Sequence, residues 1–500
     1  MFKRYLCLLI SLIVVISISF DVAYSAIKPG LSCKKPGFKS FQGTKVYVCQ
    51  KSGSNLVWKK VQSKKSPKVP LATPSSTSTS PISLPHICRP DASAPSAWKP
   101  YQEYLRSIGN MCDLNFYRYQ KIEATRYSGI QALTNEADYL PPETCQLKKS
   151  NNGPVLGFSS LQSKLSPLPF AKFQVIPIQT SDFVTKKTPQ QDYGHFFAFL
   201  ESWVKENSEN GSSFEIRVPP SYIALNKSLK EYRNIDRHNN PTTEGQQFHK
   251  DIIAAADPFV DFSGTDLFLV VVPPQVNQDF LGTNPWGTQV DTQEGKFDKF
   301  FTITPFDFSH SGPNSGFLGP QLLLHELQHA YFDFGDHGDG MAGWGLMSLP
   351  SVTDLLGWDK YLAGFYSSKQ IYCLPDSKTL SHLTPNVVRG FGKKLAVIPI
   401  SPEKIVLIES VRSGGFNYKL PKISEGVLVY EINVNETDFH KGVTLITTER
   451  GKRIDRSLAA TTGNLLGAPL KVGEFVITNG FKITNMESGN FGDIIQVERT

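Results

Sequence analysis

One pentapeptide places the strongest constraint on how this chain can fold. His325-Glu326-Leu327-Gln328-His329 is an H-E-x-x-H motif, and on an α-helix its two histidines lie one turn apart on one face. Pro320 suits the first turn of such a helix, where a backbone N–H is not needed. Burying two imidazoles and a carboxylate is costly unless they have a partner. Yet the predicted helix, residues 321–332, carries apolar residues around the motif: Leu322, Leu323, Leu324, Leu327 and Ala330.

The motif has the chemistry of a metal site. Both imidazoles can bind one tetrahedral Zn²⁺ ion, and Glu326 stands where it can act as base on a metal-bound water. A third protein ligand is needed, and the candidates that follow are, in order of preference, Asp336, His337 and Asp333. Because Asp336 and Asp339 share a glycine-rich acidic loop, a calcium-binding turn is the alternative for those two residues.

Residues 1–25 are typical of a signal peptide. A charged start, Lys3-Arg4, precedes an apolar run over residues 6–20, and small residues precede a cleavage site at Ala26. The alternative is an uncleaved anchor helix, which the shortness of the run disfavours. The sequence therefore predicts a secreted or cell-envelope-associated protein with no membrane span after cleavage.

The cysteine content fits an exported protein, in which disulfides can form. Six cysteines remain after cleavage, an even number that fits three bridges. Cys33 and Cys49 are expected to pair, because residues 26–62 are too few to hold a core without a crosslink. The other four allow three pairings, between which the sequence does not choose: Cys88, Cys112, Cys145 and Cys373.

The basic character belongs to a small N-terminal module. The net charge is +7, yet residues 28–68 hold eleven lysines and no acidic residue. The main body is therefore net acidic, which argues against a nucleic-acid partner. Residues 26–62 predict a lysine-rich module of two or three short strands that contacts an anionic cell-envelope polymer, with a solvated face as the alternative. The Ser-, Pro- and Thr-rich residues 63–86 predict a disordered linker.

The sequence of the main body predicts an α+β fold. Residues 87–169 are expected to form a helical N-terminal segment. Within residues 170–392, strands and helices alternate, which favours helices packed on a mixed sheet; the strands are 173–178, 214–218 and 266–272, and the helices are 193–205 and 244–256. From residue 393 onward, strands separated by Gly, Asn and Ser turns indicate a β-rich, sandwich-like C-terminal module.

Several segments follow the motif in a recognisable order. They are Asp336, residues 344–348 (Trp-Gly-Leu-Met-Ser), Gly357-Trp358, residues 408–412 (Ile-Glu-Ser-Val-Arg) and residues 426–430 (Gly-Val-Leu-Val-Tyr). Together they resemble the immune inhibitor A-like family of secreted bacterial zinc metallopeptidases. The resemblance implies a metzincin-like catalytic domain over residues 170–392 and a Met-turn in which Met347 lies beneath the metal. It also implies calcium sites.

The function predicted from the sequence is that of a secreted zinc endopeptidase acting on protein or peptide substrates. In this reading Glu326 activates a zinc-bound water to hydrolyse peptide bonds of extracellular proteins. The alternative is a catalytically weak or inactive relative that acts as an envelope-associated binding protein, and a zinc hydrolase of non-peptide substrates is a third reading. Five other histidines are interpreted as ordinary surface or loop residues: His195, His238, His249, His310 and His440.

Overall fold

The computed structural model divides the chain into two compact units, Met1–Ile82 and Ser83–Thr500. The described residues are 32, 39–42, 45–53, 55–60, 121–129, 131–148, 156–158, 170–232, 243–274, 276, 288–303, 324–329, 339–348, 353–390, 392–417, 420–436, 441–452 and 465–500. The predicted signal peptide (1–25) and linker (63–86) lie outside them. No helix of the described part is long and apolar enough to cross a membrane.

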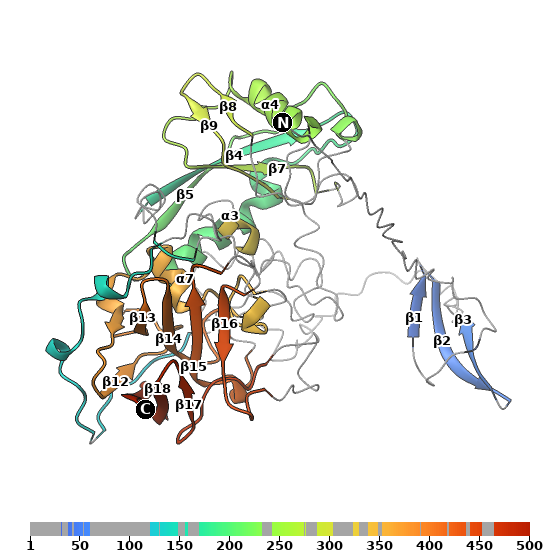
Figure 1. Cartoon of the computed structure of the whole chain (residues 1–500). Helices are drawn as coiled ribbons and strands as arrows, with labels where there is room; N and C mark the ends of the chain where they lie inside the picture. Colours follow the sequence, from blue (N-terminus) through green and yellow to red (C-terminus); the bar gives the residue numbers. More distant parts are fainter. Residues whose placement is uncertain are drawn as a thin grey trace, which may run out of the picture. The chain divides into compact units, whose positions relative to one another are not determined.

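The first unit is a small antiparallel sheet in the order β1-β2-β3 (Figure 1). Its strands are β1 (Lys39–Gln42), β2 (Lys45–Ser52) and β3 (Asn55–Lys60), which confirms the strands predicted there. Cys49 on β2 is buried and disulfide-bonded. Cys33, its predicted partner, lies outside the described residues.

The second unit begins its regular structure with a parallel sheet in the order β10-β7-β4-β5, to which β6 adds beside β4. The strands are β4 (Phe170–Gln179), β5 (Ser213–Arg217), β6 (Ile223–Ala224), β7 (Leu267–Val271) and β10 (Phe300–Ile303). We expected a mixed sheet, but every described pairing is parallel. A crossover helix between strands, α3 (Pro189–Asn207) between β4 and β5, is the connection that parallel neighbours require.

Both faces of this parallel sheet are buried, as the alternation along β7 makes clear. Leu267, Leu269 and Val271 pack into one core, and Phe268 and Val270 into another. Helix α3 covers the first face and α4 (Thr243–Ala256) the second. The start of α3 is set locally, because Thr188 at the N-cap and Gln191 at the third helical position form a reciprocal capping box, with Pro189 at the first helical position.

The C-terminal part is β-rich, as predicted, and consists of two sheets (Figure 1). One is β11 (Ile371–Cys373), β13 (Leu395–Ser401), β14 (Lys404–Val411), β15 (Gly426–Asn433) and β16 (Val443–Ile446). The other is β12 (Thr379–Leu383), β19 (Gly492–Arg499), β18 (Phe481–Gly489) and β17 (Phe475–Thr478). These sheets therefore begin at Ile371 and not at residue 393, because β11 and β12 pair with strands far along the chain.

Short elements complete the described part. They are the hairpin β8 (Val290–Asp291) and β9 (Lys296–Phe297), helix α7 (Gly357–Leu362), and the 3₁₀ turns η4 (Glu136–Asp138), η5 (Pro142–Cys145), η6 (Leu229–Tyr232), η7 (Asp339–Met341), η8 (Ser368–Gln370) and η9 (Lys422–Ser424).

The C-terminal sheet of β11, β13, β14, β15 and β16, called the five-stranded sheet below, lies between two cores. On β14, Ile405 and Leu407 face the core that contains α3, whereas Val406 and Ile408 face the four-stranded sheet. The α/β part and the β-rich part therefore share one continuous core, and the four-stranded sheet completes a sandwich on the far side.

The N-terminal segment of the body, residues 87–169, is described only in part, and residues 87–120 of the predicted helical segment lie outside the described residues. Residues 121–129 and 131–148 contain the 3₁₀ turns η4 and η5 and no α-helix, so the helical prediction does not hold for them. These residues form an extended strap attached to the C-terminal sheets. The Leu140 N–H donates to Cys373 O at 2.9 Å, and Tyr139 stacks on Tyr372 with ring centroids 4.2 Å apart.

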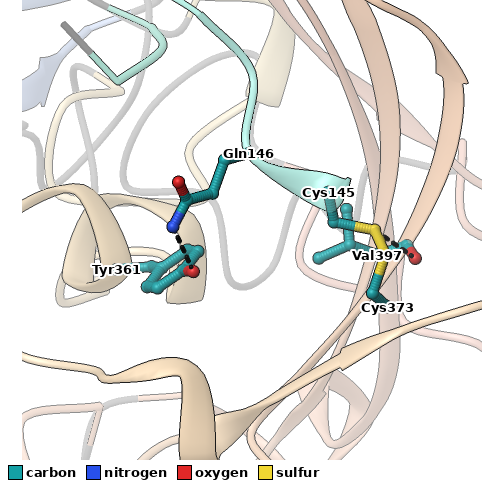
Figure 2. Close-up of a disulfide and its surroundings, with 5 residues drawn as sticks. All are labelled: Cys145, Gln146, Tyr361, Cys373 and Val397. Carbon is teal, nitrogen blue, oxygen red and sulfur yellow. Dashed lines mark hydrogen bonds between the residues drawn. A yellow bond between two sulfur atoms is a disulfide. The ribbon is translucent and has the colours of Figure 1, made fainter. Parts of the chain in front are cut away.

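A disulfide joins this strap to the sheet. Cys145 pairs with Cys373 on β11, which settles one pairing that the sequence left open (Figure 2). Beside it, Gln146 Nε2 donates to the Tyr361 hydroxyl at 2.9 Å. The other two cysteines, Cys88 and Cys112, lie outside the described residues.

Replacing Cys145 and Cys373 together by serine should destabilise the second unit by about 2–5 kcal/mol, because the crosslink restrains a long loop in the unfolded chain. Chemical denaturation of both proteins would measure the loss. Cys49→Ser, in the other compact unit, is the control and should leave the transition of the second unit unchanged. An unchanged midpoint in the double variant would contradict the crosslink.

Candidate functional site

The motif forms the helix expected of it. Residues 324–329 are helical, and Leu324 and Leu327 belong to the core shared by the parallel sheet and the five-stranded sheet. His325 is fully buried and His329 is 9% exposed, whereas Glu326 is only partly buried. The helix therefore turns its histidines inward and leaves its carboxylate nearer to solvent.

The two imidazoles converge on one point. His325 Nε2 and His329 Nε2 lie 3.1 Å apart, and the two rings are nearly perpendicular at 84°. Two nitrogen ligands of one tetrahedral Zn²⁺ ion, each bonded at about 2.0–2.1 Å, lie about 3.3 Å apart. The separation between the two Nε2 atoms therefore fits a shared metal ion.

The other nitrogen of His325 has a defined partner. His325 Nδ1 lies 3.0 Å from the carbonyl oxygen of Leu346. A carbonyl oxygen only accepts, so Nδ1 carries the proton and Nε2 carries the free lone pair. This is the tautomer a metal ion needs, and a backbone carbonyl is a usual acceptor behind a ligating histidine. Without metal, His329 can donate its own Nε2 proton to that lone pair.

The expected Met-turn lies next to the motif helix. Met347 is buried in the same core as Leu324 and Leu327. The polar contact to the histidine comes from its neighbour Leu346, through the main chain. The role of Met347 as a Met-turn stays a prediction. The sequence did not point to the Leu346 carbonyl, because a main-chain group leaves no residue-type signal.

The third ligand falls outside the description. Asp336, His337 and Asp333 all lie in residues 330–338, which are not described. Within the described residues, no three His, Cys, Asp or Glu side chains come together in an arrangement that could hold a metal ion. The structure thus places two of the predicted ligands and Glu326, and the third remains a prediction, as do the calcium sites.

Other segments of the sequence pattern meet in the same core. The Gly357 N–H, at the start of α7, donates to both carboxylate oxygens of Glu409 at 3.2 Å. The next N–H, of Trp358, donates to the Tyr430 hydroxyl at 3.3 Å. Gly357-Trp358, residues 408–412 and residues 426–430 are therefore one unit, in which β14 and β15 hold the N-terminus of α7.

Glu409 is a buried acid in this unit. Burial raises the pKa of its carboxyl group, and hydrogen bonds from Asn386 and the Gly357 N–H, together with the charge of Lys360, oppose that rise. Asn386 Nδ2 donates to it at 2.9 Å. In the sequence Glu409 is only one acidic residue within a predicted strand, because the groups that contact it come from segments far apart in the chain.

One histidine was misassigned. His249 on α4 is buried, stacks on Phe300 with centroids 4.4 Å apart, and burial lowers its pKa to about 4. We expected a surface or loop residue. Its position beside Phe248 and three residues before Ile252, on the apolar face of an amphipathic helix, is the signal that would have found it.

A groove of about 550 Å³ lies apart from the histidines, beside the C-terminal sheets. Two of its cations are paired with acids: Arg412 with Asp493 and Lys422 with Glu425, each at 2.8 Å. No motif residue lines the groove, so it is not part of the candidate metal centre.

Neither protein-family models nor curated protein sequences match this chain. The likeness to the immune inhibitor A-like family therefore stays a prediction from the sequence segments themselves.

The raised pKa of Glu409 predicts a pH dependence of stability. The folded protein holds the Glu409 proton more tightly than the unfolded chain, whose carboxyl has the ordinary pKa of 4.5. The contribution of this proton to the free energy of unfolding is therefore present in full below pH 4.5. It is lost as pH rises through the higher pKa of the folded state. Glu409→Gln removes the titration, so the stability of the variant relative to wild type should rise from pH 4.5 upward.

Unfolding free energies of both proteins, measured in urea across this range, would test the prediction. A flat or falling difference for Glu409→Gln would contradict the assigned pKa direction.

Proposed function

We propose that this chain is a secreted zinc-dependent endopeptidase that hydrolyses peptide bonds of extracellular proteins. His325 and His329 would hold the zinc ion through their Nε2 atoms, and Asp336 is the preferred third ligand, with His337 and Asp333 as alternatives. Glu326 is the general base.

One observation carries the proposal. Two Nε2 atoms lie 3.1 Å apart on a buried helix, and the Nδ1 atom of His325 donates to a main-chain carbonyl. Burying two imidazoles side by side in a core is costly, because each carries two polar nitrogens that need hydrogen-bond or metal partners there. A shared metal ion satisfies both Nε2 atoms at once.

The chemistry follows from the positions of these side chains. A zinc ion bound there supplies Lewis-acid polarisation of a carbonyl oxygen and lowers the pKa of a water molecule to about 7. Glu326 follows His325 directly and is only partly buried, so its carboxylate can meet a substrate arriving from solvent. It accepts a proton from the attacking water and donates it to the leaving amine.

Export is part of the same proposal. The predicted signal peptide supports it, and the Cys145–Cys373 disulfide is a bond that persists in an oxidising compartment. The lysine-rich module is proposed to bind an anionic cell-envelope polymer. In its described part, Lys51 and Lys59 are exposed and thus available for such contacts.

Glu326→Gln should retain about one zinc ion per chain and lose casein cleavage by at least about 100-fold, because it removes the base and keeps the ligands. His329→Ala should lose both the zinc and the cleavage. Metal analysis and a cleavage assay with and without chelator measure these effects on the full chain. Glu294→Gln is the matched control: it replaces an exposed carboxylate outside the motif and should behave as wild type.

Two results would overturn the proposal. A folded wild-type protein that binds no zinc would remove the metal site. A zinc-loaded protein without chelator-sensitive, Glu326-dependent cleavage would favour the binding-protein alternative.

Asp336→Ala should lower zinc affinity by at least about 100-fold, because it removes one of three protein ligands. His337→Ala and Asp333→Ala are the matched comparisons and should keep most of the affinity. Zinc titrations against a competing chelator measure all three. If His337→Ala loses zinc and Asp336→Ala does not, His337 is the ligand.

A further inference from the structure

The segment that contacts His325 is a tightly held turn, residues 341–348. Two main-chain hydrogen bonds define it. The Trp344 N–H donates to Met341 O at 3.2 Å, and the Ser348 N–H donates to Gly345 O at 3.0 Å. The carbonyl of Leu346, which accepts from His325 Nδ1, lies inside the second of these bonded loops.

Three hydrogen bonds that involve side chains hold the turn in place. The Gly343 N–H donates to Ser348 Oγ at 3.0 Å, and the Gly345 N–H donates to Thr353 Oγ1 at 2.7 Å. The indole N–H of Trp344 donates to Leu465 O at 3.0 Å. Ser348 and Thr353 are almost fully buried, at 2% and 3% exposure, so water cannot readily replace either hydroxyl.

Gly345, just before Leu346, has a backbone conformation that requires glycine. Its φ is +87°, and a Cβ added there would come within 2.8 Å of Leu356 Cγ. Only glycine adopts this backbone conformation readily. The Leu346 carbonyl lies one residue further along the main chain, so the hydrogen bond from the Gly345 N–H to Thr353 restrains the backbone just before the group that contacts His325.

We propose that Thr353 and Ser348 are positioning residues for the metal centre. They hold the 341–348 turn so that the Leu346 carbonyl meets His325 Nδ1 and keeps the proton there, and the Nε2 lone pair then points to the place where a metal ion would bind. The metal-binding part rests on the proposed function, whereas the control of the His325 tautomer does not. The turn acts through its main chain, and the side chain of Met347 is not the part that orients the histidine.

The size of the effect follows from the chemistry. Loss of an outer-shell hydrogen bond behind a ligating histidine typically lowers metal affinity by about 10–100-fold. Thr353→Val keeps the shape of the side chain and leaves the Gly345 N–H buried without its acceptor. Thr353→Ser restores an acceptor, and Met347→Leu changes a buried side chain of similar volume while keeping the turn.

The test compares these variants by two measurements on the full chain. Zinc affinity, from competition with a chelator, should fall by about 10–100-fold in Thr353→Val and stay within about threefold of wild type in Thr353→Ser and Met347→Leu. Nitrogen NMR of histidine-labelled, metal-free protein should show His325 protonated on Nδ1 in wild type, with a second tautomer appearing in Thr353→Val alone.

The NMR measurement separates this proposal from the proposed function. If no form binds zinc but Thr353→Val still changes the His325 tautomer, the positioning role stands and the zinc peptidase does not. If Thr353→Val keeps both the Nδ1 proton and the zinc affinity, or if Met347→Leu lowers the affinity as much, the positioning role is overturned. Should Thr353→Val fail to fold by circular dichroism, Ser348→Ala removes the other hydroxyl brace and is judged by the same criteria.

Discussion

Burial of both faces of the five-stranded sheet is the constraint on which the second unit depends. A sheet with two apolar faces needs a cover on each. The four-stranded sheet covers one face. The other face packs into the core that also contains α3, α7, residues 324–329 and one face of the parallel sheet. The histidine-bearing helix is therefore an interior element between two sheets, and neither part of the unit encloses it alone.

That location determines how the polar groups of the site must behave. In a core with little water, each buried donor or acceptor needs a partner within the protein. His325 meets this need with Leu346 O on one nitrogen and His329 on the other. Glu409 meets it with Asn386 and the Gly357 N–H. A small displacement of the turn or of α7 would leave buried polar groups unpaired, so the core acts as a rigid frame for the two imidazoles.

Much of the fold follows from periodicity in the sequence. The α/β alternation of residues 170–272 and the strands after residue 393 were predicted from patterns of 3.6 and 2 residues, because those patterns record which side chains face a core. The direction of the strands was not predicted, since the alternation of apolar and polar residues is the same in parallel and antiparallel pairs. The described residues 121–129 and 131–148, part of the segment predicted to be helical, form an extended strap. Its aromatic residues anchor it to the sheets through single contacts, such as Tyr139 on Tyr372, and not through a helical face.

The sequence by itself determined the helix at residues 324–329, the identity of His325, Glu326 and His329 on it, and the cysteines available for crosslinking. These depend on residue types at short, fixed spacings, which can be read directly from the sequence. Only the tertiary structure decided that Cys145 pairs with Cys373, that α7 rests on Glu409, and that the Leu346 carbonyl holds His325. Each joins segments separated by 21 to 228 residues, and two of the three use main-chain groups that every residue carries. Spacing along the chain does not record such contacts, because they form only when the core brings distant segments together.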